Sequence, residues 1–112
     1  MRIEIKGRNV PVGDDLRTRV DKKFGKVARQ VSPLAELEVE LKEERNPSIR
    51  DSQIAEVTLH LKGVTLRARE SSDDMGHSIN LAAEDIARQV KRHRDKRRRR
   101  RESAKAAQPR VA

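Results

Sequence analysis

The stretch IAEVTLHLKGVTLRARE, residues 54–70, alternates apolar and polar side chains on both sides of a single glycine. A period of two is typical of β-strands that bury one face. Gly63 suits the tight turn between two such strands, so the stretch predicts an antiparallel hairpin. Its predicted core-facing residues are Ala55, Val57, Leu59, Leu61, Val64, Leu66 and Ala68.

Two more strands and a helix are predicted before this hairpin. Residues 34–44 (LAELEVELKEE) alternate in the same way and leave an acidic outer face, and residues 2–6 (RIEIK) predict an N-terminal strand. Residues 14–31 place apolar side chains at helical spacing. Pro33 ends this helix, because the residue before a proline is held away from the α-helical conformation.

A second helix follows the hairpin. Asp73 or Asp74 suits its N-cap, and its apolar stripe continues in steps of three and four until it reaches His93 and Arg97. The predicted order is therefore β-α-β-β-β-α, and each helix is apolar on one side only. We expect an α+β two-layer sandwich, with one four-stranded sheet and two helices packed on one face. The stripe comprises Met75, Ile79, Ala82, Ile86 and Val90.

Length and composition set the class of protein. A chain of 112 residues predicts one domain, and the absence of cysteine excludes a disulfide framework and thiolate zinc ligation. No apolar run approaches the roughly 20 residues of a membrane span, and the N-terminus lacks the apolar core of a signal peptide. We expect a soluble cytoplasmic protein with no membrane partner.

The net charge of +9 is concentrated in one segment. Residues 88–101 (RQVKRHRDKRRRRR) hold ten Lys or Arg and one Asp, so the rest of the chain is neutral. A segregated basic block favours a polyanionic partner, although charge alone does not separate RNA from DNA or an anionic membrane. Phe24 is the only aromatic residue, which argues against binding that stacks bases on the sheet.

The basic block divides into two parts. Its first part is predicted to follow a helix, with the charges close to one line that adjoins the basic face of the first helix. Its second part occupies every side of a helix, so it suits an auxiliary electrostatic anchor, a solvated helix end or a linker. The candidate RNA-binding residues are Arg88, Lys91, Arg92 and Lys96, with Lys22, Lys23 and Lys26; the candidate anchor is Arg97, Arg98, Arg99, Arg100 and Arg101.

No pattern in the chain predicts catalysis. The three histidines lack the short spacing of a metal site and are expected on the surface or at a seam. There is no glycine-rich phosphate loop and no nucleophile with a supporting base. We expect a protein that is not an enzyme and has no cofactor, metal or small-molecule substrate. We divide the chain into a binding domain, residues 1–97, and a basic, disordered tail or linker, residues 98–112.

Three segments resemble a known family. They are IEIKGRNVPV (residues 3–12), DDMGHSI (residues 73–79) and ARQVKRHRDK (residues 87–96). Over about residues 1–97 the chain resembles the ribosome hibernation promoting factors, which include ribosome-associated inhibitor A (protein Y). Two positions depart from the family pattern: Gly76 stands where a tyrosine is common, and Asp85 stands where a lysine is common.

The resemblance implies a translation inhibitor that binds the small ribosomal subunit and its 16S rRNA. Such proteins occupy the channel of mRNA and the A- and P-site tRNAs, and they contact rRNA through basic helix residues. By position the matching residues are Arg88, Lys91, Arg92 and Lys96. The weaker matches are Lys22, Lys23 and Lys26 of the first helix. Long members add a domain that dimerises ribosomes, so the chain is either a short member or the N-terminal half of a long one. A generic double-stranded RNA-binding module is the alternative.

Overall fold

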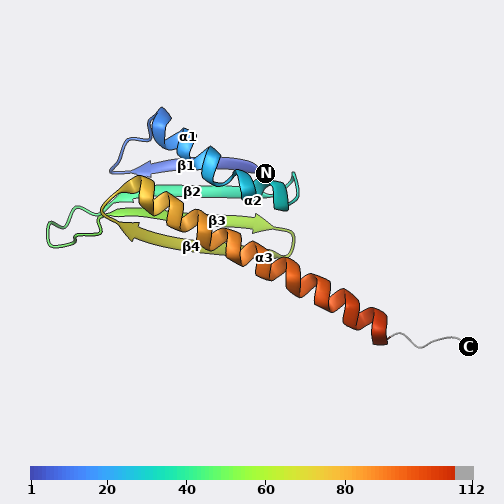
Figure 1. Cartoon of the computed structure of the whole chain (residues 1–112). Coiled ribbons are helices and arrows are strands. Elements are labelled where there is room, and N and C mark those ends of the chain that lie inside the picture. The colour runs from blue at the N-terminus through green and yellow to red at the C-terminus, as the bar shows by residue number, and fades with distance from the viewer. Residues whose placement is uncertain (108–112) are drawn as a thin grey trace, which may run out of the picture.

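The computed structural model describes residues 1–107 and has the predicted element order, β-α-β-β-β-α, with the first helix divided in two (Figure 1). The elements are β1 (Arg2–Arg8), α1 (Asp14–Lys23), α2 (Gly25–Gln30), β2 (Glu36–Glu43), β3 (Gln53–Leu61), β4 (Val64–Ser72) and α3 (Met75–Ala107).

The four strands form one sheet in the order β1-β2-β3-β4. β1 pairs with β2 in parallel, and the other two pairings are antiparallel. The predicted hairpin is confirmed: Leu61 pairs with Val64 across its turn, and Gly63 adopts a φ of +79°, which glycine reaches without steric cost. The register aligns one apolar row across all four strands, through Ile3, Leu37, Leu59 and Leu66.

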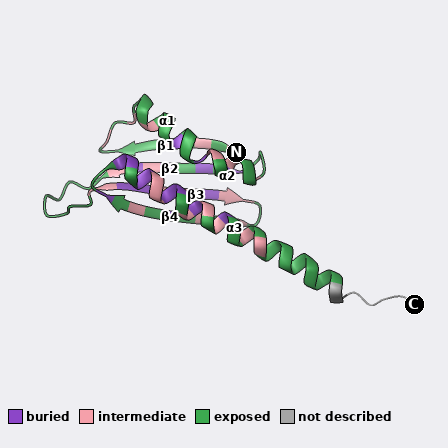
Figure 2. Cartoon of the chain, viewed as in Figure 1, coloured by how far each residue is buried: buried purple, intermediate pink, exposed green. Residues whose placement is uncertain are grey.

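All three helices cover the same face of the sheet, which confirms the two-layer sandwich (Figure 1). α1 and α2 lie over β1 and β2, while α3 crosses β3 and β4 and also packs against α1 and α2. Figure 2 shows buried residues where the two layers meet. Phe24, Leu59 and Ile86 are fully buried there. The core-facing residues of the edge strand β4 are less covered, because Val64 and Leu66 are only half-buried.

The prediction of a single helix over residues 14–31 is wrong in one respect: two helices form, and they are separated at Phe24. This residue leaves the helical conformation, with φ −90° and ψ 1°, and Gly25 begins a second helix. The break keeps its backbone hydrogen bonds: the Phe24 N–H donates to the Val20 carbonyl and the Ala28 N–H donates to the Phe24 carbonyl. Glycine has a low helix propensity, which makes this the weakest point of the segment.

The C-terminal segment also differs from the expectation of disorder, since α3 continues to Ala107. Residues 98–107 contain only Arg, Glu, Ser, Ala and Lys. Most of these are strong helix formers, and neither glycine nor proline interrupts them. A helix that has already formed over the sheet therefore propagates through the arginine run. Residues 108–112 of the predicted tail lie outside the described residues.

The first turn of α3 is anchored by side-chain hydrogen bonds. The Asp74 carboxylate accepts a hydrogen bond from the His77 N–H at 2.8 Å, so Asp74 is the N-cap. The buried Ser78 hydroxyl donates to the Gln53 carbonyl at 2.6 Å and lies 2.7 Å from the Ser72 hydroxyl. These contacts join the start of α3 to the start of β3 and the end of β4.

Replacing Ser78 with alanine should therefore lower the free energy of unfolding by about 1–3 kcal/mol, because the Gln53 carbonyl loses a buried donor. Urea denaturation of Ser78→Ala, with the exposed Ser71→Ala as control, measures this. If the two variants unfold at the same urea concentration, the hydroxyl does not anchor the helix.

Candidate nucleic-acid interface

The outer side of α3 carries the four cations of the basic helix surface. Arg88, Lys91, Arg92 and Lys96 are all exposed, while the intervening Val90 is 2% exposed and faces the core. At about 100° per residue, Arg88 and Arg92 lie about 40° apart, but Lys91 and Lys96 lie about 140° apart. The expectation that the four lie close to one line is therefore wrong: they form a broad stripe over the solvent side of the helix.

A second group of cations lies at the α1–α2 break. Lys22, Lys23 and Lys26 are exposed, and the apolar residues between them, Phe24 and Val27, are buried. Because α1 and α2 pack beside α3, both groups belong to the helical layer and none belongs to the sheet (Figure 1).

Arg19, on the basic face of α1, contacts the start of α3, and this contact was not predicted. Its guanidinium donates to the Asn80 side-chain carbonyl at 3.5 Å, so α1 reaches the first turns of α3. A Cβ atom on Gly76 would lie 3.0 Å from the Arg19 guanidinium carbon. The missing side chain at Gly76 thus provides the space in which Arg19 rests on α3. The departure of Gly76 from the family pattern was visible in the sequence, but its partner across the layer was not.

Asp85, the second departure, has a structural role. It is half-buried and accepts a hydrogen bond from the Gln89 amide at 3.1 Å. The same amide donates to the Arg67 carbonyl at 2.7 Å, which ties α3 to the edge strand β4. The carboxylate is thus part of a contact between the helix and the sheet.

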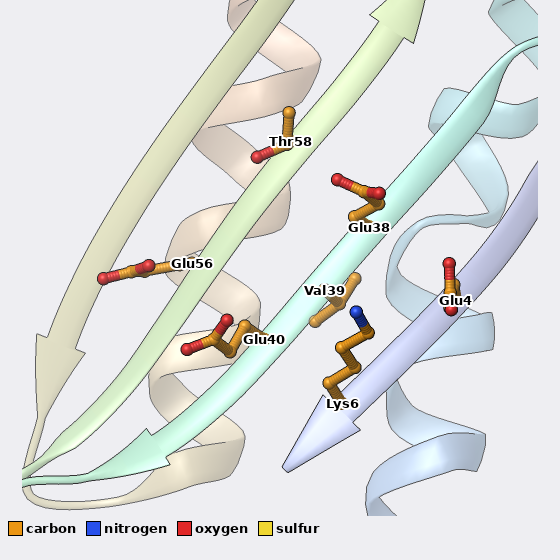
Figure 3. Close-up of a pocket in the computed structure, with 7 residues that line it drawn as sticks. All are labelled: Glu4, Lys6, Glu38, Val39, Glu40, Glu56 and Thr58. Atoms are coloured by element: carbon orange, nitrogen blue, oxygen red, sulfur yellow. The ribbon is translucent and has the colours of Figure 1, made fainter. Parts of the chain in front are cut away.

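The outer face of the sheet carries charges of both signs. A shallow hollow of about 120 Å³ on this face is lined mainly by carboxylates, as Figure 3 shows. Several are paired: Glu56 lies 2.7 Å from Lys42, Glu38 lies 3.2 Å from His60, and Glu40 lies 3.9 Å from Arg8. The outer face thus carries carboxylates and cations together and has no aromatic side chain on which bases could stack, which leaves nucleic-acid binding to the helices. The lining residues are Glu4, Lys6, Glu38, Val39, Glu40, Glu56 and Thr58.

The ion pairs lower the pKa of one carboxylate, that of Glu56. A hydrogen bond from the Lys42 ammonium lowers the pKa of Glu56 below its usual value, and the positive charges of Lys42, Arg69 and Arg8 lower it further against the opposing effect of burial. The Arg69 guanidinium lies 3.5 Å from the same carboxylate. Glu56 therefore joins β2, β3 and β4 on the solvent face.

An apolar groove of about 550 Å³ opens at the end of the sheet where α3 leaves it. Val31, Leu61 and Val90 contribute to its walls, and Leu34 at its rim is 91% exposed. His93 is half-buried in this groove, which confirms the predicted seam position. Arg97 also lines the groove, so it still faces the domain.

Two other kinds of site are missing from residues 1–107. No group of three or more His, Cys, Asp or Glu side chains in this part of the chain is placed to hold a metal ion. No helix in the same range is long and apolar enough to cross a membrane.

The geometry defines an α+β domain that presents cations on its helical layer and paired acids on its sheet. The chain belongs to the family described as Sigma 54 modulation protein / S30EA ribosomal protein, which it matches over residues 3–98. This confirms the family resemblance found in the sequence.

Curated relatives are longer than this chain. A ribosome hibernation promotion factor from Picosynechococcus sp. is 32% identical over 97 residues, which are 86% of this chain and 50% of the relative. The protein of the same name from Staphylococcus aureus is 35% identical over 96 residues, which are 84% of this chain and 48% of the relative. The chain thus spans about half the length of these relatives.

Solved structures share the fold. The N-terminal domain of Protein Y from Thermus thermophilus matches with a TM-score of 0.70 and 28% identity, covering 83% of this chain and 99% of that domain. A ribosomal subunit interface protein from Coxiella burnetii matches with the same TM-score at 20% identity, covering 85% of this chain and 99% of that one, which supports the fold alone.

The lowered pKa of Glu56 yields a test of the sheet face. A group whose pKa is lower in the folded state adds stability above its unfolded pKa and loses it as pH falls through the folded pKa. The stability difference between the wild type and Glu56→Gln should therefore be present at pH 7 and shrink steadily as the pH falls below about 4.3, the usual glutamate value. Urea denaturation between pH 2.5 and 7 measures it.

The matched control is Glu4→Gln, which alters a carboxylate on the same face that forms no ion pair within residues 1–107. Equal pH profiles for the two variants would contradict a stabilising role for Glu56.

Proposed function

We propose that this chain is a ribosome hibernation factor that binds the small ribosomal subunit and blocks translation. The observation that carries the proposal is the exposed cationic stripe of Arg88, Lys91, Arg92 and Lys96, held on a helix whose other side is buried. Family membership and two relatives named ribosome hibernation promotion factor support the same function. The proposed action is binding, without a cofactor or a chemical step.

A rigid helix suits the binding of folded RNA. The buried side chains Ile86 and Val90 fix the rotation of α3 about its axis. The cations on its solvent side are thereby held in place, so little backbone entropy is lost when they meet phosphates. Each phosphate contact releases counterions, which makes the affinity fall with salt. We infer that Arg88, Lys91, Arg92 and Lys96 contact 16S rRNA, with Lys22, Lys23 and Lys26 as a second contact from the adjacent helices.

The helical layer sets the orientation of the bound domain. The candidate cations lie on this layer, whereas cations and carboxylates of the outer sheet face are paired with one another, so we infer that the helical layer faces the rRNA. A folded domain lodged in the channel of mRNA and the A- and P-site tRNAs excludes them by volume alone. The proposed partner lies in the cytoplasm and no membrane is involved.

Two alternatives make different predictions. A generic double-stranded RNA-binding module would bind any A-form duplex as tightly as the small subunit, so an excess of duplex RNA would compete it off. The N-terminal half of a ribosome-dimerising factor would bind the subunit but pair ribosomes only when joined to a further domain. Membership of the S30EA family favours the second alternative over the first.

Reversing the charges of Arg88, Lys91 and Arg92 to glutamate should abolish co-sedimentation with small ribosomal subunits and restore translation in vitro. The physical reason is that three attractive phosphate contacts become repulsive. The matched control reverses Arg45, Arg50 and Arg67, which are equally exposed but lie outside the helical layer. Circular dichroism should show that both triple variants are folded.

Loss of binding in the control as well would mean that total charge, and not the helix surface, directs the interaction. Unchanged binding by the Arg88, Lys91 and Arg92 variant would overturn the proposed function.

Deleting residues 97–112 should weaken binding without eliminating it. The salt dependence of the affinity should become shallower by roughly 0.9 log units for each phosphate that the shortened chain no longer neutralises. Titrations of labelled protein with small subunits at several salt concentrations measure both effects. Complete loss of binding at low salt would show that the binding residues lie in the deleted segment and not in residues 1–96.

A further inference from the structure

We propose that residues 98–107 of α3 act as a rigid rod that enters a cleft in RNA with phosphates on opposite walls. This inference rests on the proposed function, since it takes the partner to be rRNA. It concerns how the arginine run binds RNA. We infer that phosphates surround the helix, and that the run neither binds as a flexible tail nor lies with one side on an RNA surface.

The first observation is where the domain stops covering α3. Val90 is 2% exposed, His93 is half-buried and Arg97 lines the groove at the end of the sheet. From Arg98 to Lys105 every residue is exposed. Figures 1 and 2 show this part of α3 extending beyond both layers. The rod is therefore exposed to solvent on all sides, whereas one side of residues 75–97 is covered by the domain.

The second observation is a change of charge pattern at the same place. Up to Lys96 the exposed side of α3 mixes cations with acids such as Glu84. Arg98, Arg99, Arg100 and Arg101 then follow without interruption, and steps of about 100° place them on four different sides of the helix. Cations surround the helix only where the domain no longer covers one side of it.

The width of the helix makes this arrangement informative. An α-helix with side chains is about 10–12 Å across, and the Debye length at physiological salt is about 8 Å. Arginines on the far side of a rod that lay on one phosphate surface would thus be largely screened. Phosphates on opposite walls would engage all four. RNA offers such a site where two of its helices pack side by side, because phosphates line both walls of the cleft between them; the major groove of one A-form helix is too narrow to admit the rod.

In the unbound rod, neighbouring positive charges repel one another, and phosphates around the rod would remove this repulsion. Arg101 and Lys105 are four residues apart, and like charges at this spacing destabilise a helix. Phosphates on all sides offset the repulsion. Binding should therefore stabilise the rod, and amide hydrogen exchange of residues 98–105 should slow when small ribosomal subunits are added.

Four single variants test the enclosure directly: Arg98→Ala, Arg99→Ala, Arg100→Ala and Arg101→Ala. Each removes one charge from a different side and keeps a strong helix former. With purified small subunits at physiological salt, each should weaken binding about threefold, because about one phosphate is left without its cation. If the rod lay on a surface, only the variants on the sides that touch the surface would weaken binding, and the variant on the opposite side would bind normally. That pattern would overturn the proposal.

A second pair of variants separates a rigid rod from a flexible tail, which would also use all four arginines. Asp95→Pro breaks the helix between the domain and the rod, while Asp95→Ala removes the same carboxylate and keeps the helix. The proline variant should bind at least about tenfold more weakly than the alanine variant. Equal affinities would mean that the direction of the rod is irrelevant, and the inference would fail.

The Arg88, Lys91 and Arg92 triple variant is measured alongside these. If it retains full binding, the proposed function fails and this inference with it. If it abolishes binding while the rod variants show a one-sided pattern, the proposed function stands and only the enclosure is refuted.

Discussion

The burial of one apolar stripe of α3 against β3 and β4 is the constraint on which the other features depend. Ile79 and Ile86 are fully buried and Val90 is nearly so, and each such side chain contributes about 1.5–3 kcal/mol relative to an exposed one. A helix fixed by these contacts cannot rotate. The azimuth of every remaining side chain is then determined, and the cations between Arg88 and Lys96 are directed away from the sheet by the same contacts that stabilise the domain.

The same constraint separates the charges into two layers. The positive side chains of the candidate interface lie on helices, whereas the carboxylates of β2 and β3 lie on the opposite surface. Glu56 and Glu40 remain there because cations such as Lys42 and Arg8 pair with them. A chain that is neutral outside residues 88–101 thus concentrates its excess positive charge on α3, whereas the outer face of the sheet carries carboxylates and cations together.

Much of this arrangement could be predicted, because periodicity reports directly on burial. The alternation of residues 54–70 determined the hairpin, and the steps of three and four from Met75 to Val90 determined which side of α3 is buried. Tertiary contacts could not be predicted. The break at Phe24 leaves the apolar stripe uninterrupted, and the support of Arg19 by Gly76 joins residues far apart in the chain. The roles of the candidate RNA-binding residues stay predictions, since the structure shows their exposure and grouping but holds no partner.

The expectation of disorder from residue 98 is wrong for residues 98–107, which instead form the solvated helix end that was the other interpretation of the arginine run. A run of arginines has no apolar periodicity, so it could not fold as an isolated segment. Helix formation, however, is limited by nucleation, and each further residue costs little once a helix exists. The nucleus here is the part of α3 held on the sheet, and the ten residues of 98–107 extend it. The stripe that folds the domain therefore also directs the rod. A partner that grips the rod is in turn coupled through one continuous helix to the sheet, which a flexible linker would not permit.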